Sequence, residues 1–201
     1  MSEVILTDVQ VQEKLKEMLV KSHAWLEGHF RLTSGKHSGN YMQCAMMLRF
    51  PEYAAFAGQE IARRIAHLKP DFITSPALGG LIIGHEVARA LNVPFLFCER
   101  ENGDMKLRRF PMPAGQSFVA VEDVVTTGGS VKETAEHLVA GGCKWVGTAC
   151  IVDRSGGKQV VDPNLVSLFK VSFPTYEPDD CPLCRELGTA PIKPGSRPDK
   201  K

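Results

Sequence analysis

The stretch Phe118-Val-Ala-Val-Glu-Asp-Val-Val-Thr-Thr-Gly-Gly-Ser-Val131 decides the fold class. Its first four residues are apolar or small without interruption, which is typical of a strand covered on both faces in a parallel sheet. Two carboxylates follow, and a run of valine, hydroxyl and glycine residues then leads into a helix predicted over 131–140. Ser130 is a candidate cap for this helix, and the glycines at 141 and 142 end it.

The residues after this strand predict a binding site for a phosphate group. Gly128 and Gly129 let the backbone curl so that successive N–H groups converge, and the helix N-terminus adds partial positive charge. The carboxylates of Glu122 and Asp123 would repel a phosphate, but they suit sugar hydroxyls or a hydrated magnesium ion. The order therefore predicts ribose and phosphate bound side by side. The alternative is a plain helix cap with a polar loop, which would need neither two acids nor two glycines.

Strand and helix patterns alternate from residue 71 onward, which predicts an α/β fold with a mainly parallel sheet and helices on both sides. Ligands of such sheets bind beyond the carboxyl ends of the strands, where the motifs at 76–80, 122–130 and 153–154 fall. The expected strands are 71–75, 93–98, 117–121 and 144–152, and the expected helices are 80–91 and 131–140.

The rest of the chain predicts smaller parts around this sheet. A helix capped by Asp8 is expected to run to about residue 27, two short strands should lie between 30 and 48, and a second helix should span about 51–68. We expect a single domain over residues 1–201, with a small hood formed by about 1–48 and a C-terminal tail from about 174. The segment 193–201 is predicted to fray.

The segment from Glu122 to Ser130 resembles the phosphoribosyl-diphosphate signature of the type I phosphoribosyltransferases. Within that family the segments 28–38, 71–89 and 146–157 resemble the orotate-using members, so the similarity covers nearly the whole chain. The resemblance implies a glycosyltransferase that transfers ribose 5-phosphate from 5-phosphoribosyl 1-diphosphate (PRPP) to orotate, with Mg²⁺ as cofactor. Its products would be orotidine 5′-monophosphate and diphosphate, as in pyrimidine (UMP) biosynthesis.

The resemblance also implies roles for individual residues in binding PRPP. The two acids would hold the ribose hydroxyls, and the loop after them would hold the 5′-phosphate through N–H and hydroxyl groups. Solvated acids at a strand end are the alternative. The implied PRPP residues are Glu122, Asp123, Val124, Val125, Thr126, Thr127, Gly128, Gly129 and Ser130.

Orotate binding is implied for Arg154, Thr126 and Tyr41. A guanidinium forms a two-pronged bond with a carboxylate, which orotate has and uracil lacks. Arg154 could instead pair with Asp153 or another surface acid, and Tyr41 could be a core aromatic rather than a ring that stacks on the base. His37, in the same segment as Tyr41, is a further candidate for a general acid or base.

The basic arm, residues 99–109, carries four cationic side chains. In the family a mobile basic loop closes over the diphosphate, often in the neighbouring subunit of a dimer, so the resemblance implies a homodimer. Arg100 and Lys106, with Asp123, are the catalytic candidates, and a solvated hairpin is the alternative. Many relatives carry Tyr-Lys where this chain has Leu78-Gly79, so one lysine expected at the diphosphate is missing.

Composition limits the classes of function. A chain of 201 residues that is 43% hydrophobic can build one sizeable core. Its net charge of +1 argues against a nucleic-acid partner, and no apolar run predicts a membrane span or a secretory signal. The 6 cysteines are expected to be mostly buried free thiols, which indicates a reducing, cytoplasmic setting.

The pair Cys181 and Cys184 has the spacing of a zinc or redox motif. Because the C-terminal stretch offers no second pair and no histidine, the two cysteines are predicted to serve in packing, and no metal ligands are predicted among the side chains.

Two other functions remain open from the residues. The first is a purine or uracil phosphoribosyltransferase, against which Arg154 and the segment 30–38 speak. The second is a non-enzymatic regulator that senses nucleotides and binds RNA on the same fold, for which a basic face would be expected.

Overall fold

The computed structural model describes residues 6–32, 34–159, 161 and 164–194. Its centre is a six-stranded sheet with the strand order β5-β4-β3-β6-β7-β8. Every neighbouring pair is parallel except β4 and β5, so the predicted α/β class is confirmed. The strand β8 was not predicted. The strands are β3 (Phe72–Pro76), β4 (Phe95–Glu101), β5 (Asp104–Lys106), β6 (Ser117–Val125), β7 (Lys144–Asp153) and β8 (Val166–Lys170).

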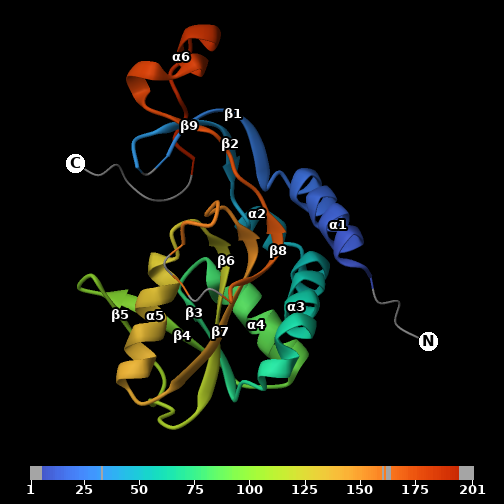
Figure 1. The fold of residues 1–201 in the computed structure, drawn as a ribbon, viewed down its shortest axis with the longest axis vertical. Helices are drawn as coiled ribbons and strands as arrows, with labels where there is room; N and C mark the ends of the chain where they lie inside the picture. Colours follow the sequence, from blue (N-terminus) through green and yellow to red (C-terminus); the bar gives the residue numbers. More distant parts are fainter. Residues whose placement is uncertain (1–5, 33, 160, 162–163, 195–201) are drawn as a thin grey trace.

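Helices cover both faces of this sheet (Figure 1). The buried residues of the first half of β6 divide between the faces: Val119 and Val121 belong to one core cluster, and Phe118 and Ala120 belong to the other. All four are 0% exposed, which confirms the strand predicted from their apolar run. The first cluster packs against α1 (Asp8–Lys21), α3 (Pro51–Ile65) and α4 (Gly80–Leu91), and the second packs against α5 (Gly129–Ala140).

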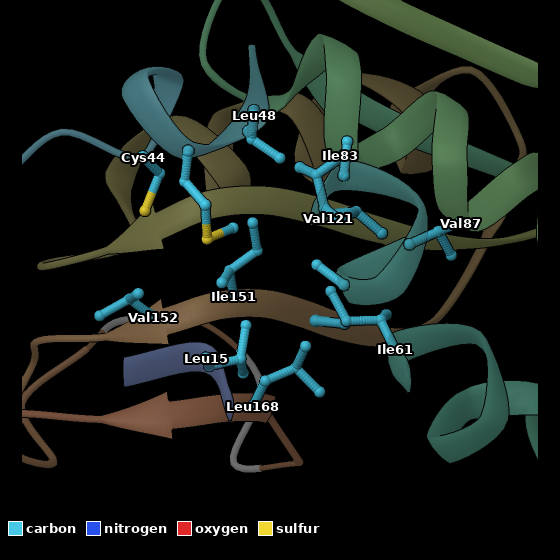
Figure 2. Packing of buried hydrophobic residues seen from close by; sticks show 14 of the residues in the cluster. Leu15, Cys44, Leu48, Ile61, Ile83, Val87, Val121, Ile151, Val152 and Leu168 are labelled. Carbon is cyan, nitrogen blue, oxygen red and sulfur yellow. The ribbon is translucent and has the colours of Figure 1, made fainter. Parts of the chain in front are cut away.

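Figure 2 shows the larger cluster from close by. Leu15 of α1, Ile61 of α3 and Ile83 of α4 meet Val121 of β6 and Ile151 of β7 there. Burying such side chains is worth about 1.5–3 kcal/mol each, so this layer holds the strand ends at a fixed place. The 3-10 turn η1 (Ala66–Leu68) extends α3 and completes the helix predicted over 51–68.

A second, three-stranded sheet lies at one end of the molecule (Figure 1). The strands β1 (Trp25–Arg31) and β2 (His37–Met42) form an antiparallel hairpin, and β9 (Thr175–Tyr176) pairs with β2. The short helix α2 (Ala45–Leu48) leads from the hairpin into the main body. Beyond β9 come the 3-10 turn η2 (Pro178–Asp180) and the helix α6 (Pro182–Leu187).

The C-terminal segment therefore belongs to the smaller sheet. After α6 the chain returns, and Ile192 bridges to Phe30. Of the segment 193–201 that was predicted to fray, residues 195–201 lie outside the described residues.

Two predictions near the N-terminus are wrong. The first helix ends at Lys21 rather than near residue 27, because His23 adopts a left-handed φ of 58° and the strand β1 starts at Trp25. Trp25 packs on Phe173 with ring centroids 5.4 Å apart, and this tertiary contact outweighs the helical pattern. Residues 45–48 form a helix where a strand was expected.

Helix caps also differ from the predictions. Thr7, not Asp8, caps α1, and it forms a capping box with Gln10. The strand β6 continues through the two acids to Val125, and α5 begins after Gly128 rather than after Ser130. No helix among the described residues combines the length and apolar character that crossing a bilayer requires.

Candidate active site

The loop between β6 and α5 needs a glycine at residue 128. Gly128 has a φ of 81°, a conformation that side-chain-bearing residues rarely adopt, and it is the N-cap of α5. A Cβ atom at this position would lie 2.7 Å from Cγ1 of Val161. The glycine therefore fixes the start of α5, and the first N–H groups of that helix face the loop.

A cavity of about 230 Å³ lies over this loop. All nine residues implied in PRPP binding contribute to its lining. The opposite wall comes from the end of β3 and the loop after it, residues 76–79. The cavity is thus bounded by the carboxyl ends of β3 and β6, the place that a parallel sheet offers to ligands.

The loop after β3 approaches the two acids very closely. A Cβ atom on Gly79 would lie 2.9 Å from Oδ1 of Asp123 and 3.2 Å from Oε1 of Glu122. The next residue, Gly80, is equally confined, since its Cβ would lie 2.9 Å from the carbonyl oxygen of Val121. Both glycines are required for this approach of backbone to strand end. The Leu78 side chain, which lines the cavity, is 82% exposed.

The carboxylates of Glu122 and Asp123 offer oxygen atoms at the cavity wall. Oδ1 of Asp123 accepts a hydrogen bond of 2.8 Å from the N–H of Val124, and Oε1 of Glu122 accepts one of 3.2 Å from the N–H of Asp123. Carboxylate oxygens beside a space for phosphates are the ligands that Mg²⁺ prefers, so this donor set fits a magnesium ion carried by a diphosphate.

A second cavity, of about 540 Å³, adjoins the first. Asp123, Val124, Thr126 and Thr127 line both cavities. The second cavity extends from the end of β6 towards the three-stranded sheet, and it includes all three residues implied in orotate binding. Its lining residues are Leu32, Ser34, Tyr41, Met42, Gln43, Cys44, Ala45, Asp123, Val124, Thr126, Thr127, Arg154 and Pro194.

Arg154 is the cation of this larger cavity. It follows β7, and its N–H donates to the carbonyl of Val125 over 2.8 Å, which ties it to the end of β6. Its guanidinium lies 5.2 Å from the ring centroid of Phe173. Burial lowers the pKa of Arg154, and nearby Tyr41 acts in the opposite direction; an arginine stays charged under either influence.

The alternative role of Arg154, an ion pair with Asp153, is not observed. The Asp153 carboxylate accepts hydrogen bonds from the N–H and the hydroxyl of Ser155 instead, at 2.9 and 2.6 Å. Within the described part of the chain Arg154 forms no ion pair, and its buried Nε has no hydrogen-bond partner. A charged, buried donor without an internal partner indicates an anionic ligand.

Tyr41 and Cys44 complete the wall beside Arg154. The Tyr41 ring packs against Phe30 with centroids 5.9 Å apart, so one position serves both the packing of the hairpin and the cavity. Burial, and then the charge of Asp123, raises the pKa of the Cys44 thiol well above its usual value. Cys44 is therefore a neutral thiol in this wall, which excludes it as a nucleophile.

The catalytic candidates of the basic arm lie elsewhere. None of residues 99–109 is among those that line the two cavities. Arg100 pairs with Glu133 of α5 at 2.5 Å, and Lys106 lies 3.4 Å from Glu101 on the adjacent strand. The arm thus forms the hairpin β4–β5, and its cationic groups engage carboxylates of their own chain.

Several lining residues were missed in the sequence. Met42, Gln43 and Ala45 are ordinary side chains in an ordinary pattern, and only the hairpin places them at the cavity. Pro194 comes from the far end of the chain, and no local signal connects it with Arg154. His37, the candidate acid or base, does not line either cavity.

The parallel sheet, the phosphate loop and the paired acids define a type I phosphoribosyltransferase fold. The family described as "Phosphoribosyl transferase domain" matches residues 49–179. An orotate phosphoribosyltransferase of Thermotoga maritima is 49% identical over 91% of this chain and 98% of its own length. One from Desulforamulus reducens is 46% identical over 92% of this chain and 97% of its own. The crystal structure of orotate phosphoribosyltransferase from Aeropyrum pernix superposes with a TM-score of 0.67 at 25% identity, covering 87% and 98% of the two chains. The chain belongs to the orotate phosphoribosyltransferase family.

Proposed function

We propose that the smaller cavity binds PRPP and that the larger one binds orotate. The chain is accordingly a glycosyltransferase of pyrimidine biosynthesis, which transfers ribose 5-phosphate from PRPP to N1 of orotate. The products are orotidine 5′-monophosphate and diphosphate. Two adjoining cavities suit this reaction, because the sugar carbon of one substrate must meet the ring nitrogen of the other.

One observation carries the proposal. The nine residues Glu122 to Ser130 line one cavity, and Thr126 at its edge also lines the cavity that holds Arg154 and Tyr41. A phosphate loop and a half-buried arginine, whose Nε has no hydrogen-bond partner among the described residues, are thereby joined by a shared wall. PRPP and orotate are both anions, and each finds a complementary group on its own side.

In the smaller cavity, the acidic side chains and the phosphate loop bind different parts of PRPP. Glu122 and Asp123 accept hydrogen bonds from the ribose hydroxyls, which we expect to contribute roughly 1.5–3 kcal/mol each. The N–H groups and hydroxyls of residues 126–130 hold the 5′-phosphate at the start of α5. The backbone of residues 76–79 lies beside the diphosphate in this proposal.

In the larger cavity, Arg154 binds the orotate carboxylate through a two-pronged pair of hydrogen bonds. Tyr41 offers a ring face to the base, and Thr126 offers a hydroxyl. A purine or uracil lacks the carboxylate and would leave the buried guanidinium without a partner, so these bases should be strongly disfavoured.

The reaction breaks the bond between the anomeric carbon and the diphosphate oxygen and forms a bond from that carbon to N1. The charge of orotate lies on its carboxylate, so the proton on N1 must also leave as the new bond forms; the departing diphosphate or water can accept it, and the chain needs no dedicated base. The carboxylates near the ribose favour the positive charge that develops on the sugar. Glu122 and Asp123 would hold a magnesium ion that accompanies the diphosphate, and such an ion would supply neutralising charge to the leaving group.

The basic arm completes the site from a second subunit in this proposal. Arg100 and Lys106 belong to the β4–β5 hairpin, which lies beside α5 at the side of the molecule (Figure 1), and neither residue lines a cavity of its own chain. A homodimer would bring them to the diphosphate of the partner and would exclude water from the sugar. The whole chain then acts as one phosphoribosyltransferase domain. Its 6 cysteines are all free thiols, which supports a reducing, cytoplasmic setting.

The proposal is tested by mixing the protein with orotate, PRPP and Mg²⁺ and following the loss of orotate absorbance. We expect turnover with orotate and little with uracil or adenine. Asp123→Asn should lower kcat/KM for PRPP by about 10–100-fold, as the loss of a charged acceptor predicts. Glu136→Gln, an exposed acid of α5, is the control and should leave the rate unchanged. Equal use of uracil would overturn the assignment of the base.

A further inference from the structure

Four side chains that can bind a metal converge at the far side of the three-stranded sheet. His29 belongs to β1 and His37 to β2. Cys181 is the N-cap of α6, and Cys184 lies within that helix. One ligand atom from each lies within 4.8 Å of the others. The C-terminal stretch itself supplies no second pair of ligands, as the sequence indicated. The two candidate ligands come instead from the opposite end of the sequence, since His29 precedes Cys181 by 152 positions.

The separations of these atoms match the edges of a tetrahedron. With bonds of about 2.0 Å to nitrogen and about 2.3 Å to sulfur, a tetrahedral zinc site has N···N edges of about 3.3 Å and N···S edges of about 3.5 Å. The two histidine nitrogens, Nε2 of His29 and Nδ1 of His37, lie 3.1 Å apart. The Cys181 sulfur lies 3.7 Å from Nε2 of His29, and the Cys184 sulfur lies 3.6 and 3.3 Å from the two nitrogens.

Hydrogen bonds alone leave this cluster unsatisfied. Nδ1 of His29 lies 3.1 Å from the carbonyl oxygen of Thr189, which can only accept, so Nδ1 carries the proton. In the neutral ring Nε2 then has a single lone pair. Three groups approach that lone pair: His37, Cys181 and Cys184. One cation at the centre would instead receive one electron pair from each of the four side chains.

We propose that these four side chains form a structural zinc site. Two thiolates and two imidazoles in a tetrahedron are the donor set of structural zinc sites, and the contact to Thr189 orients His29 as backbone carbonyls do for metal-bound histidines. The site is largely buried, because His29 and His37 are 5% exposed and Cys181 is 1% exposed, while Cys184 is half-buried. None of the four residues lines a substrate cavity, so the role is structural and separate from the magnesium chemistry.

The zinc would fasten the C-terminal segment to the β1–β2 hairpin. The other contacts of that segment are few. The strand β9 contributes two residue pairs to the sheet, Ile192 forms backbone hydrogen bonds with His29 and Arg31, and Lys36 and Glu177 form a surface ion pair, but none of the α6 residues is buried. Its large apolar side chains Leu187 and Ile192 are 52% and 65% exposed. Figure 1 shows α6 at the end of the molecule remote from the larger sheet. The same segment leads to Pro194, so the metal would also steady one wall of the larger cavity.

The first test measures metal in the intact wild-type chain, produced without an affinity tag and purified without chelators. Elemental analysis should give one zinc per chain after exhaustive dialysis into magnesium buffer. Replacement by Co²⁺ should produce the visible bands of a tetrahedral site and a thiolate-to-cobalt charge-transfer band. Absence of zinc together with failure to take up Zn²⁺ or Co²⁺ would overturn the proposal.

Variants assign the ligands. Cys184→Ser should lower the zinc content from one per chain to well under a half and abolish the cobalt charge-transfer band. The matched control is Cys143→Ser, whose sulfur lies 3.3 Å from the carbonyl of Pro113 and takes no part in the cluster; it should retain the zinc. Equal metal content in both variants would contradict the assignment of Cys184.

Thiol titration keeps the proposal testable even if Cys184→Ser fails to fold. In native wild-type protein, stripping the metal with a strong chelator should release zinc and make two additional thiols reactive. Recovery of Cys181 and Cys184 as a disulfide without zinc would overturn the proposal in favour of a redox pair. Because the readouts are metal and thiols, failure here leaves orotate turnover unaffected and is distinguishable from failure of the proposed function.

Discussion

Gly79 and Asp123 face each other so closely that no side chain fits between them. A Cβ atom on Gly79 would lie 2.9 Å from Oδ1 of Asp123, a separation that real Cβ atoms essentially never show. The glycine comes from the loop after β3 and the aspartate from the end of β6. The carboxylate proposed to hold the ribose is therefore positioned by the loop proposed to lie along the diphosphate.

Gly79→Ala should reduce catalysis, and its effect on catalysis can be measured apart from its effect on folding. The added methyl group must push either the loop or the Asp123 carboxylate away, and a displacement of about 1 Å can cost up to about 100-fold in rate. We expect kcat/KM for PRPP to fall by about 10–100-fold, with a smaller change in the KM for orotate. Steady-state kinetics with each substrate varied in turn, alongside thermal unfolding, measures both effects.

The control for this variant is Gly39→Ala in β2. Its Cβ would meet Leu183 at 3.7 Å, an ordinary contact, and its φ is not in the left-handed region. This variant should have close to wild-type kinetics. If Gly79→Ala were equally active, the loop would not constrain Asp123 as argued.

The central sheet and the phosphate loop could be predicted because their signals are local. The residues Phe118 to Val121 are apolar because both faces of β6 are covered, and Gly128 is a glycine because its backbone φ is 81°. Each reason acts within a few residues of the chain. The ends of the strands were less predictable. The strand β6 continues through Glu122 and Asp123, whereas charged residues in a sequence usually indicate that a buried strand has ended.

The parts that could not be predicted depend on contacts between distant residues. The first helix stops early because Trp25 packs on Phe173, which no pattern near residue 25 records. The cysteine pair gained its candidate partners from the hairpin at the other end of the chain. Pro194 reaches the larger cavity by the same route. Sequence spacing describes neighbours along the chain, whereas these features arise from a segment that crosses back over the fold.

Arg154 should determine the choice of base. Arg154→Ala removes the two-pronged bond to the orotate carboxylate, worth roughly 1.5–3 kcal/mol, so the KM for orotate should rise by about 10–100-fold. The KM for PRPP should change much less. Arg154→Lys keeps the charge but not the planar fork, and an intermediate loss is expected.

The matched control is Arg49→Ala. Arg49 also lies over a phenylalanine ring, 4.8 Å from the centroid of Phe50, but it does not line the larger cavity. Its loss should leave both KM values within about twofold, as the small energy of an exposed cation–π contact predicts. Equal increases in both KM values for Arg154→Ala would point to a general loss of the site instead of a lost carboxylate contact.

The basic arm can be assigned to its own or to the partner site by complementation. One strongly impaired variant carries Arg100→Ala with Lys106→Ala, and the other carries Asp123→Asn. In a mixed dimer, the site with intact Asp123 receives the intact arm of its partner. Random exchange should therefore restore roughly a quarter of wild-type activity, because half of the dimers are mixed and each has one complete site. If the arm acts within its own chain, mixing restores nothing.

The buried thiol of Cys98 in β4 should make the free energy of unfolding fall at alkaline pH. Its side chain is 0% exposed, and burial raises the pKa of the Cys98 thiol from the usual 9.0 to about 12. Between these two values the unfolded chain loses the proton and the folded chain keeps it. The stabilisation is therefore complete below pH 9.0 and is lost as pH rises towards about 12. Over that window this thiol should lower the free energy of unfolding by about 1.4 kcal/mol per pH unit.

Cys98→Ala should be less stable at pH 7 because of the cavity it creates, yet its stability should decline less steeply above pH 9.0 than that of the wild type. Urea unfolding at a series of alkaline pH values measures both slopes. Parallel slopes would mean that the Cys98 thiol ionises in the folded protein as it does in the unfolded chain.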